Sequence, residues 1–416
     1  MIKKIVIVAC LFYSMISFAQ EGTASPYSYY GIGEVRFKGS QENRSMGSLS
    51  IMSDSIHVNL QNPASYSDLK LTTFSIGGSA ITTKLKTDSQ TAKTTRATLD
   101  YMAVGLPIGK LGMSFGLIPY SSVGYKIKTI FEDGSKNNRL LNGSGGLNKV
   151  FLGFGYKITH NLSIGADVQY NFGNIETSSL EFVTDIPVGT RQLNTADLSG
   201  VNFNIGGMYK AKINKKLNVY TSLNFTPENT LKSKNSINIA TVNYDTFFNL
   251  VIVDEIDSID ENVDLKYSSK LSFGAGIGES KKWLVGAEIT QQNKANLYNT
   301  YNTDAKVSFG QYSKYVIGGF FIPNYQSFTS YAKKIVYRGG LKYEKTGLVI
   351  DSESINDVGF TLGLGLPLRG TFSNINIGFE FGKKGTTKSN LIQENYANVS
   401  IGLSLNDKWF EKRKFN

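Results

Sequence analysis

From about Leu71 onward, apolar and polar residues alternate with a period of two, in one segment after another. The clearest run covers residues 162–172, where apolar side chains take the even positions and Ser, Gly, Asp, Gln and Asn the odd ones. Similar runs occur at residues 201–206, 375–381 and 399–405. A period of two is typical of β-strands with one apolar and one polar face. The pattern therefore predicts an all-β protein.

About fourteen segments carry this pattern, separated by turns and polar loops. We predict strands near residues 71–84, 94–106, 111–131, 147–158, 162–183, 199–213, 217–241, 265–279, 283–301, 304–322, 334–347, 355–367, 371–384 and 393–406. An even number of antiparallel strands suits a closed membrane barrel, in which the apolar face meets lipid and the polar face lines the lumen.

The connections between these segments differ in length in a regular way. Every second connection is tight and mostly basic: Gly109-Lys110, Thr159-His160-Asn161, Asn214-Lys215-Lys216, Ser280-Lys281-Lys282 and Arg369-Gly370. The alternate connections are long and polar, as in residues 132–146, 184–199 and 243–264. Short periplasmic turns and long extracellular loops are the signature of an outer-membrane barrel. A longer stretch, Pro323 to Lys334, breaks the rule on the periplasmic rim, and a short amphipathic helix is expected there.

The stretch from Arg44 to Asp68 has no clear period, is rich in Ser and Asn, and ends in Asn62-Pro63-Ala64 just before the first strand. Such a segment cannot span the membrane or form a core of its own. We predict that it folds as a plug inside the polar lumen. The expected organisation is a leader and plug at residues 20–68, a barrel at 69–410 and a basic periplasmic tail at 411–416.

The first nineteen residues have the features of a secretory signal peptide, with a basic Lys3-Lys4 start, an apolar core and Ser17-Phe18-Ala19 as a cleavage site. We expect cleavage after Ala19 and location in the outer membrane of a Gram-negative bacterium. The single cysteine, Cys10, lies inside this peptide. The preceding residues loosely resemble a lipoprotein box, but cleavage there leaves too short an apolar core. The mature chain therefore has no thiol chemistry.

Composition supports the barrel and argues against some partners. After residue 20 no run approaches the ~18 apolar residues that a spanning helix needs. The chain has 42 Gly, 23 Tyr and 25 Phe, which suits an all-β membrane protein. Its net charge is +11, but the basic residues are scattered rather than gathered, so no nucleic-acid partner is expected.

Two features resemble the FadL family of outer-membrane transporters for hydrophobic compounds. One is Asn62-Pro63-Ala64 before the first strand, and the other is Pro119 inside the third strand. Proline cannot donate to a β-ladder, so it demands a bulge or break. The resemblance implies that the N-terminal segment is a hatch and that a lateral gap opens at Pro119 and Tyr120. The leader from Ser25 to Gly33 is also similar to Bacteroidetes members of the family.

The resemblance implies passive uptake of a hydrophobic small molecule, either fatty-acid-like or aromatic. The hatch residues would be Asn62, Pro63, Ala64 and His57, with exit beside Pro119. The other expected partners are membrane lipid and lipopolysaccharide. Some related barrels are instead accessory subunits of type IX secretion, so the alternative is a non-transporting barrel that docks on that or another outer-membrane machine. A continuous apolar channel favours transport, and a lumen packed shut below protruding loops favours docking.

Particular side chains are expected to serve the plug and the entrance. The polar groups of residues 48–62 should bond to lumen residues, because backbone at membrane depth must find partners. The candidate partners are Asp167, Gln169, Glu288 and Glu380. Aromatic side chains could gather an apolar solute at the extracellular rim, namely Phe131, Phe247, Phe248 and Tyr298.

No enzyme chemistry, cofactor or metal is predicted. Residues 112–116 match G-x-S-x-G, but Ser114 falls within an alternating strand rather than on a strand-to-helix elbow. A barrel hydrolase would pair Ser114 with His57 or His160. The acidic run at residues 254–261 lacks the central glycine of a calcium loop, so we expect a solvated extracellular loop. A looser interpretation has divalent ions bridging this run to lipopolysaccharide phosphates.

Overall fold

The computed structural model describes residues 22–35, 37, 39–130, 137–183, 186–247, 249–294 and 306–408. The expected signal peptide with Cys10, the basic tail, and the rim aromatics Phe131, Phe248 and Tyr298 lie outside the described residues.

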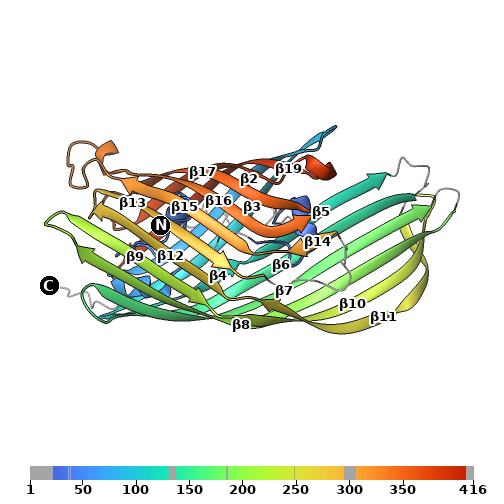
Figure 1. Ribbon diagram of the computed structural model, residues 1–416, viewed down its shortest axis with the longest axis horizontal. Coiled ribbons are helices and arrows are strands. Elements are labelled where there is room, and N and C mark those ends of the chain that lie inside the picture. The colour runs from blue at the N-terminus through green and yellow to red at the C-terminus, as the bar shows by residue number, and fades with distance from the viewer. Residues whose placement is uncertain are drawn as a thin grey trace, which may run out of the picture.

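The described chain forms one antiparallel sheet of nineteen strands, drawn in Figure 1. The strands are β1 (Glu34–Val35), β2 (Thr72–Lys86), β3 (Thr91–Ile108), β4 (Leu111–Pro119), β5 (Ser121–Ile130), β6 (Asn137–Lys157), β7 (Leu162–Val183), β8 (Gly189–Lys212), β9 (Leu217–Thr226), β10 (Asn229–Tyr244), β11 (Leu250–Tyr267), β12 (Lys270–Glu279), β13 (Trp283–Gln292), β14 (Val307–Phe309), β15 (Tyr312–Phe321), β16 (Val336–Ile350), β17 (Glu353–Pro367), β18 (Asn374–Lys384) and β19 (Gln393–Asp407). Helices are short: η1 (Pro26–Tyr29), α2 (Gln41–Arg44), η2 (Pro63–Asp68), η3 (Ala332–Lys334) and η4 (Lys388–Asn390).

These strands build a closed barrel of fourteen staves within the described residues, where a stave is one strand, or two consecutive strands, running the length of the barrel wall. Four staves each consist of two strands: β4 with β5, β9 with β10, β11 with β12, and β14 with β15. We count each pair as one stave because both of its strands pair with the same neighbouring stave. Strand β19 closes the ring by pairing with β2 from Gln393↔Lys86 to Asp407↔Thr72. The predicted all-β, antiparallel barrel is confirmed. No helix among the described residues is long and apolar enough to cross a bilayer.

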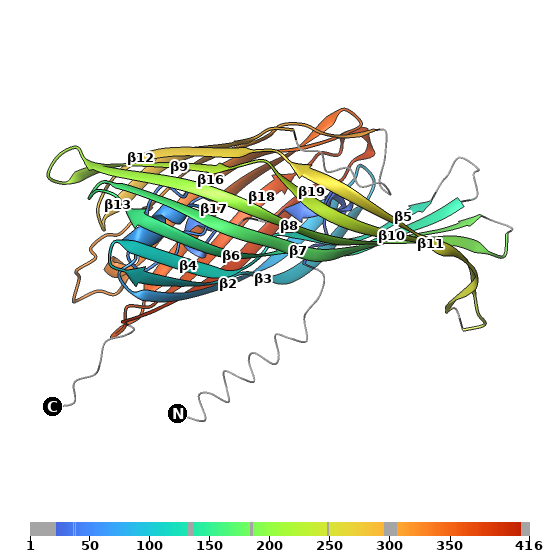
Figure 2. The same ribbon diagram turned by 90° about the horizontal axis from the view of Figure 1, so that it is seen from below.

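The outer surface shows where the bilayer ends. On β7 the outward side chains are apolar from Ile164 to Phe172, and polar at Asn174 and Glu176. Because lipid accepts only apolar side chains, the rest of β7, up to Val183, projects beyond the membrane. Strands β8, β10 and β11 continue beside it, and Figure 2 shows them running far past the rest of the barrel.

This projecting rim corrects part of the sequence prediction. Residues 137–146, 189–199 and 250–264, predicted as loops, are strand in β6, β8 and β11. In β11 the described side chains of residues 250–262 are exposed on both faces, which removes the apolar–polar alternation that marks a strand. In β8, Ala196 and Leu198 are buried in an apolar cluster, but polar residues surround them in the sequence. The opposite rim has the tight turns that were predicted. The residues between β15 and β16 hold only the three-residue η3 rather than an amphipathic helix.

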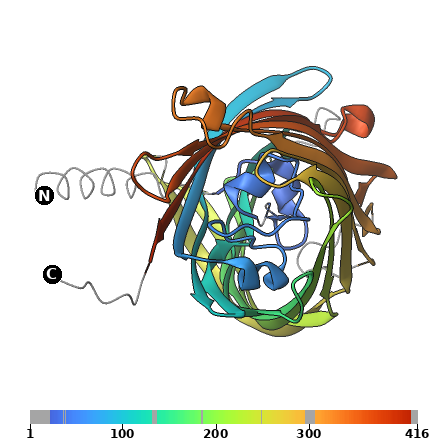
Figure 3. The same ribbon diagram turned by 90° about the vertical axis from the view of Figure 1, so that its left-hand side faces the viewer.

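The plug, residues 39–71, fills the lumen, as Figure 3 shows in a view along the barrel. Its longest helical segment has six residues, and most of its side chains are buried. A chain with so little helix or strand must bond its backbone to the surrounding wall or to its own side chains. The predicted plug is therefore present as a packed segment.

Glycines on the lumen face let the plug backbone touch the wall. A Cβ at Gly112 would lie 1.8 Å from the carbonyl oxygen of Tyr66, and one at Gly318 2.1 Å from that of Met46. Such positions tolerate only a hydrogen atom, since a carbon atom that is not bonded to the oxygen cannot approach it so closely. Gly155, Gly165 and Gly340 meet the plug backbone in the same way, whereas Gly363 and Gly378 meet plug side chains. Lumen glycines therefore form the seat of the plug.

Replacing a seat glycine should displace the plug. Gly112→Ala places its methyl group against the backbone of Tyr66 and Ser67, and overpacking of this kind costs about 1–3 kcal/mol. We expect a lower midpoint in the heat-induced loss of the compact barrel on gels. Gly207→Ala is the matched control, because nothing lies within 4 Å of a Cβ there. Equal midpoints for the two variants would contradict the seat.

Candidate functional site

The tripeptide Asn62-Pro63-Ala64 packs against the lumen wall at β6, β7 and β8. The side chain of Asn62 accepts a hydrogen bond from the Ala64 amide at 3.0 Å and so caps η2, in which Pro63 is the first residue. The amide group of Asn62 donates to the carbonyl oxygens of Gly207 and Leu223, at 3.3 and 3.1 Å. Ala64 is fully buried. The motif therefore both starts a helical turn and fastens it to β8 and β9.

The middle of the plug is held by side chains of the wall. Glu288 on β13 accepts hydrogen bonds from the amide and the hydroxyl of Ser50, at 2.9 and 2.8 Å. Thr361 on β17 accepts from the amide of Gly47 at 2.9 Å. The expected role of Glu288 is thus confirmed. Asp167, Gln169 and Glu380, which were also expected to hold the plug, bond instead to other residues of the wall.

His57 lies in the lower part of the plug between two carboxylates. Its Nδ1 is 2.6 Å from Asp54 and its Nε2 is 3.5 Å from Glu42, and Asn374 on β18 lies 3.2 Å from Nε2. Burial disfavours the charged imidazole, but Asp54 and Glu42 outweigh burial and raise the pKa of His57 above its usual 6.5. Burial alone would raise the pKa of Asp54, yet His57 lowers it to about 2. The predicted hatch residue His57 is therefore part of an ion cluster that ties the plug loop together.

Two cavities lie on either side of the plug. The lower cavity, about 1320 Å³, opens toward the tight turns and is lined by His57, Arg338 and His160. The upper cavity, about 440 Å³, opens toward the projecting rim and is partly floored by Leu60 and Gln61 of the plug. Tyr120, which was predicted for the lateral gap, lines the upper cavity. The plug thus separates the two cavities.

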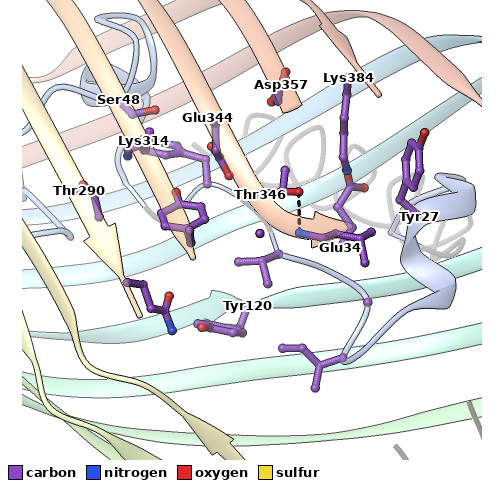
Figure 4. A pocket seen from close by; sticks show the side chains of 18 of the residues that line it. Tyr27, Glu34, Ser48, Tyr120, Thr290, Lys314, Glu344, Thr346, Asp357 and Lys384 are labelled. Carbon is purple, nitrogen blue, oxygen red and sulfur yellow. Dashed lines mark hydrogen bonds and ion pairs between the residues drawn. The ribbon is translucent and has the colours of Figure 1, made fainter. Parts of the chain in front are cut away.

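The upper cavity is lined by seven basic and seven acidic side chains. Lys342 binds Glu380 at 2.6 Å and Asp357 at 3.1 Å, and Figure 4 shows Asp357 beside Lys314 and Glu344 from the neighbouring staves. These side chains are largely buried, so their charges depend on one another rather than on bulk water. Aromatic and aliphatic side chains, among them Tyr267, Phe309 and Leu348, line the same cavity, so its wall combines charged and apolar parts.

Further ion pairs fix the leader, residues 22–35, along the upper cavity. Lys384 on β18 binds Glu34 at 2.8 Å, and both are labelled in Figure 4. Ser25 donates to Glu394 on β19, and Tyr27 donates to the carbonyl oxygen of Ile392. The leader is therefore attached to the last two staves before the chain enters the plug.

The third stave breaks at the predicted place. Strand β4 ends at Pro119 and β5 begins at Ser121, while the Tyr120 amide donates to Leu147 at 2.7 Å. Strand β3 pairs with β4 only from Met102↔Leu117 to Ile108↔Leu111. Among the described residues no strand pairs with the upper part of β3 on this side, so the break leaves a gap in the backbone pairing between β3 and β5.

The leader occupies the edge that this break exposes. Its two-residue strand β1 pairs with β5 through Glu34↔Ser122 and Val35↔Ser121. Close contact is possible because Gly33, at φ +86°, has no side chain to meet Val123. Ile32 and Tyr125 are buried together in an apolar cluster behind it. The leader thus covers the β5 side of the gap.

Sequence reasoning missed the charged wall. Lys342, Asp357 and Glu380 stand on three consecutive staves, and their positions follow from the register between those staves. A period-two pattern places each of them on the lumen face but does not say which meet. Ser114 lies in mid-strand of β4, so it lacks the sharp turn of a nucleophile elbow.

The pH dependence of the plug loop should follow His57. Since the pKa of His57 is raised, its charged form stabilises the loop fully below pH 6.5, and this contribution is lost as the pH rises through the raised value. We expect hydrogen exchange of residues 53–58, corrected for intrinsic rates, to accelerate over that range in the natural protein. In His57→Gln the corrected exchange should not change with pH there. Identical profiles would contradict the role of His57.

Solved structures with the same fold include two toluene transporters and a FadL homologue. The Pseudomonas putida toluene transporter TodX is 14% identical, with a TM-score of 0.58 over 90% of this chain and 99% of its own. The Ralstonia pickettii toluene transporter TbuX is 12% identical, with a TM-score of 0.57 over 88% and 98%. A Pseudomonas aeruginosa FadL homologue is 10% identical, with a TM-score of 0.57 over 90% and 99%. No curated protein matches the chain.

These likenesses confirm the predicted FadL-like fold. The Bacteroidetes assignment stays a prediction. The family models add a more specific result, because the model described as BamG matches residues 1–416, the whole chain. The protein therefore belongs to the BamG family.

Proposed function

We propose that this protein is a closed barrel that docks on another outer-membrane assembly, rather than a channel. The observation that carries the proposal is the seat of the plug. Plug backbone touches wall backbone at Gly112 on β4, and at Gly318 and Gly340, which are cross-strand partners on the adjacent strands β15 and β16. Opening a path through the lumen would require all of these contacts to separate. A plug fixed in this way is suited to holding a barrel shut.

The charged upper cavity supports the same proposal. A hydrocarbon gains about 0.8 kcal/mol for each CH₂ group that it transfers from water to an apolar site. The ion pairs of Lys342 and Lys384 offer no such site, and a bound hydrocarbon would displace the water around them. Passage of an apolar compound along this wall is therefore unfavourable.

The projecting rim gives the barrel a surface for a partner. Strands β6, β7, β8, β10 and β11 extend above the apolar belt as one sheet. Phe247, at the tip between β10 and β11, has 81% of its side chain exposed. Exposed apolar side chains on an ordered, water-facing sheet are typical of an interaction surface.

Uptake of hydrophobic compounds is the second candidate, and the break at Pro119 favours it. The gap beside β5 lies where the FadL resemblance places a lateral exit, and TodX and TbuX are named as toluene transporters. In this chain the route would also require β1 to leave β5. The ligand would enter from the rim, pass the displaced leader and leave sideways into lipid.

A transport assay on purified protein separates the two candidates. Proteoliposomes should take up no more fatty acid or toluene than empty liposomes, because the plug contacts stay closed. Ala64→Trp, which enlarges the fully buried plug residue, should leave this baseline unchanged. Purification from the native membrane should yield the barrel with a stoichiometric partner. Uptake above the empty-liposome level, lost in Ala64→Trp, would instead establish the channel.

A further inference from the structure

The acidic run predicted as a loop forms part of an open sheet edge. Strand β11 pairs with β10 from Tyr267↔Asn229 to Leu250↔Tyr244. The next stave, β13, ends at Gln292, opposite Lys270 at the start of β12. Within the described residues β11 therefore extends beyond its neighbour with one edge unpaired. Figure 2 shows β11 on the projecting part of the sheet.

This edge lacks two of the usual devices against pairing, proline and lysine. Natural edge strands are protected by charged side chains (above all lysine), by proline, by β-bulges or by being very short. Residues 250–264 contain no lysine, arginine, proline or glycine. Two register shifts against β10 bend the strand without ending its ladder. The edge is thus long and able to pair.

Apolar side chains are exposed along the same strand, above the bilayer. Val253, Ile256 and Ile259 are 60%, 59% and 56% exposed. These residues lie opposite β10, which pairs with the part of β8 that projects beyond the membrane. Lipid therefore does not cover them. A partner strand along this edge would remove them from water.

The charge of the edge indicates what kind of strand fits. Residues 250–264 hold six acidic side chains and no basic one, on a chain whose net charge is +11. Four exposed acids have neutral cross-strand neighbours, Asp254↔Thr241, Glu255↔Ala240, Asp260↔Ser236 and Glu261↔Asn235, whereas the fifth, Asp264, lies opposite Lys232. None of the four forms an ion pair with another described residue. Their charge is therefore available to a basic partner.

We propose that the free edge of β11 binds an extended segment of a partner protein that carries lysine or arginine, as an added antiparallel or parallel strand. The inference rests on the docking function proposed above and names its surface. Main-chain hydrogen bonds would provide the affinity, and the acidic side chains the specificity. Two copies of β11 would place acids opposite acids, so pairing between copies of this chain is disfavoured.

A defined peptide tests the edge directly. The probe is a fluorescent ten-residue peptide of alternating lysine and valine, with the purified barrel in detergent. The matched peptides replace lysine by glutamate, or two central valines by proline. Only the first should bind and slow hydrogen exchange within residues 250–264. Equal binding of the proline peptide, or protection elsewhere, would overturn strand addition.

Charge-reversal variants test the specificity. Asp254→Lys/Glu255→Lys/Glu261→Lys should weaken the lysine peptide by at least about tenfold, because three opposite-charge pairs are lost. The control is Glu176→Lys/Asp197→Lys/Glu228→Lys, which reverses three exposed acids elsewhere, on β7, on β8 and between β9 and β10. It should change affinity less than about twofold. Similar losses in both variants would show general charge attraction and overturn the inference.

The native membrane separates this inference from the function on which it rests. If the natural protein and the control variant purify with a partner and the β11 variant does not, both stand. If all three retain the partner, docking stands and the β11 edge is the wrong surface. If the natural protein brings no partner, docking itself is wrong. Calcium-dependent protection of residues 250–264 by lipopolysaccharide vesicles, with none by the peptide, would assign the edge to lipid.

Discussion

The structure depends on one constraint: the plug backbone inside the barrel must reach hydrogen-bond partners on the wall, and the wall must leave it the space to come that close. The plug has almost no regular secondary structure, so its amides and carbonyls reach wall side chains such as Glu288 and Thr361. They can do so only if the wall is close. Glycine on the lumen face provides that closeness, because a Cβ at Gly112 or Gly318 would overlap the plug backbone. The alternation of glycine with apolar residues in the strands follows from this requirement.

A second consequence concerns the lumen above the plug. The leader is attached by ion pairs, including Lys384 with Glu34, and the wall beside it is crossed by Lys342 and its two carboxylates. Buried charges are held by one another and by hydrogen bonds, so losing one partner is costly. The same network that orders the leader leaves little room for an apolar solute. The FadL-like fold therefore surrounds an interior that is crossed by ion pairs.

The sequence was sufficient for the barrel because lipid on one face and a polar lumen on the other impose a period of two. It was also sufficient for the break at Pro119, since proline lacks the amide that a ladder requires. The sequence did not predict residues 250–264 of β11 as a strand, because water on both faces removes the alternation of apolar and polar side chains. It also could not identify the glycine seat, since a lumen glycine has the same pattern whether it faces water or plug backbone. The ion pair between Lys342 and Glu380 depends on the register between neighbouring strands, and the pattern within a single strand does not determine that register.

The central claim is that the plug is fixed to the wall as firmly as the staves are to one another. Hydrogen exchange of residues 39–71 in the natural protein, reconstituted in a bilayer, measures this most directly. Protection of the amides of Gly47, Ser50 and Ala64 comparable to that of the barrel strands is the predicted result. Exchange of these amides within seconds, while the strands stay protected, would contradict it. The plug would then be a gate rather than a fixed part of the wall.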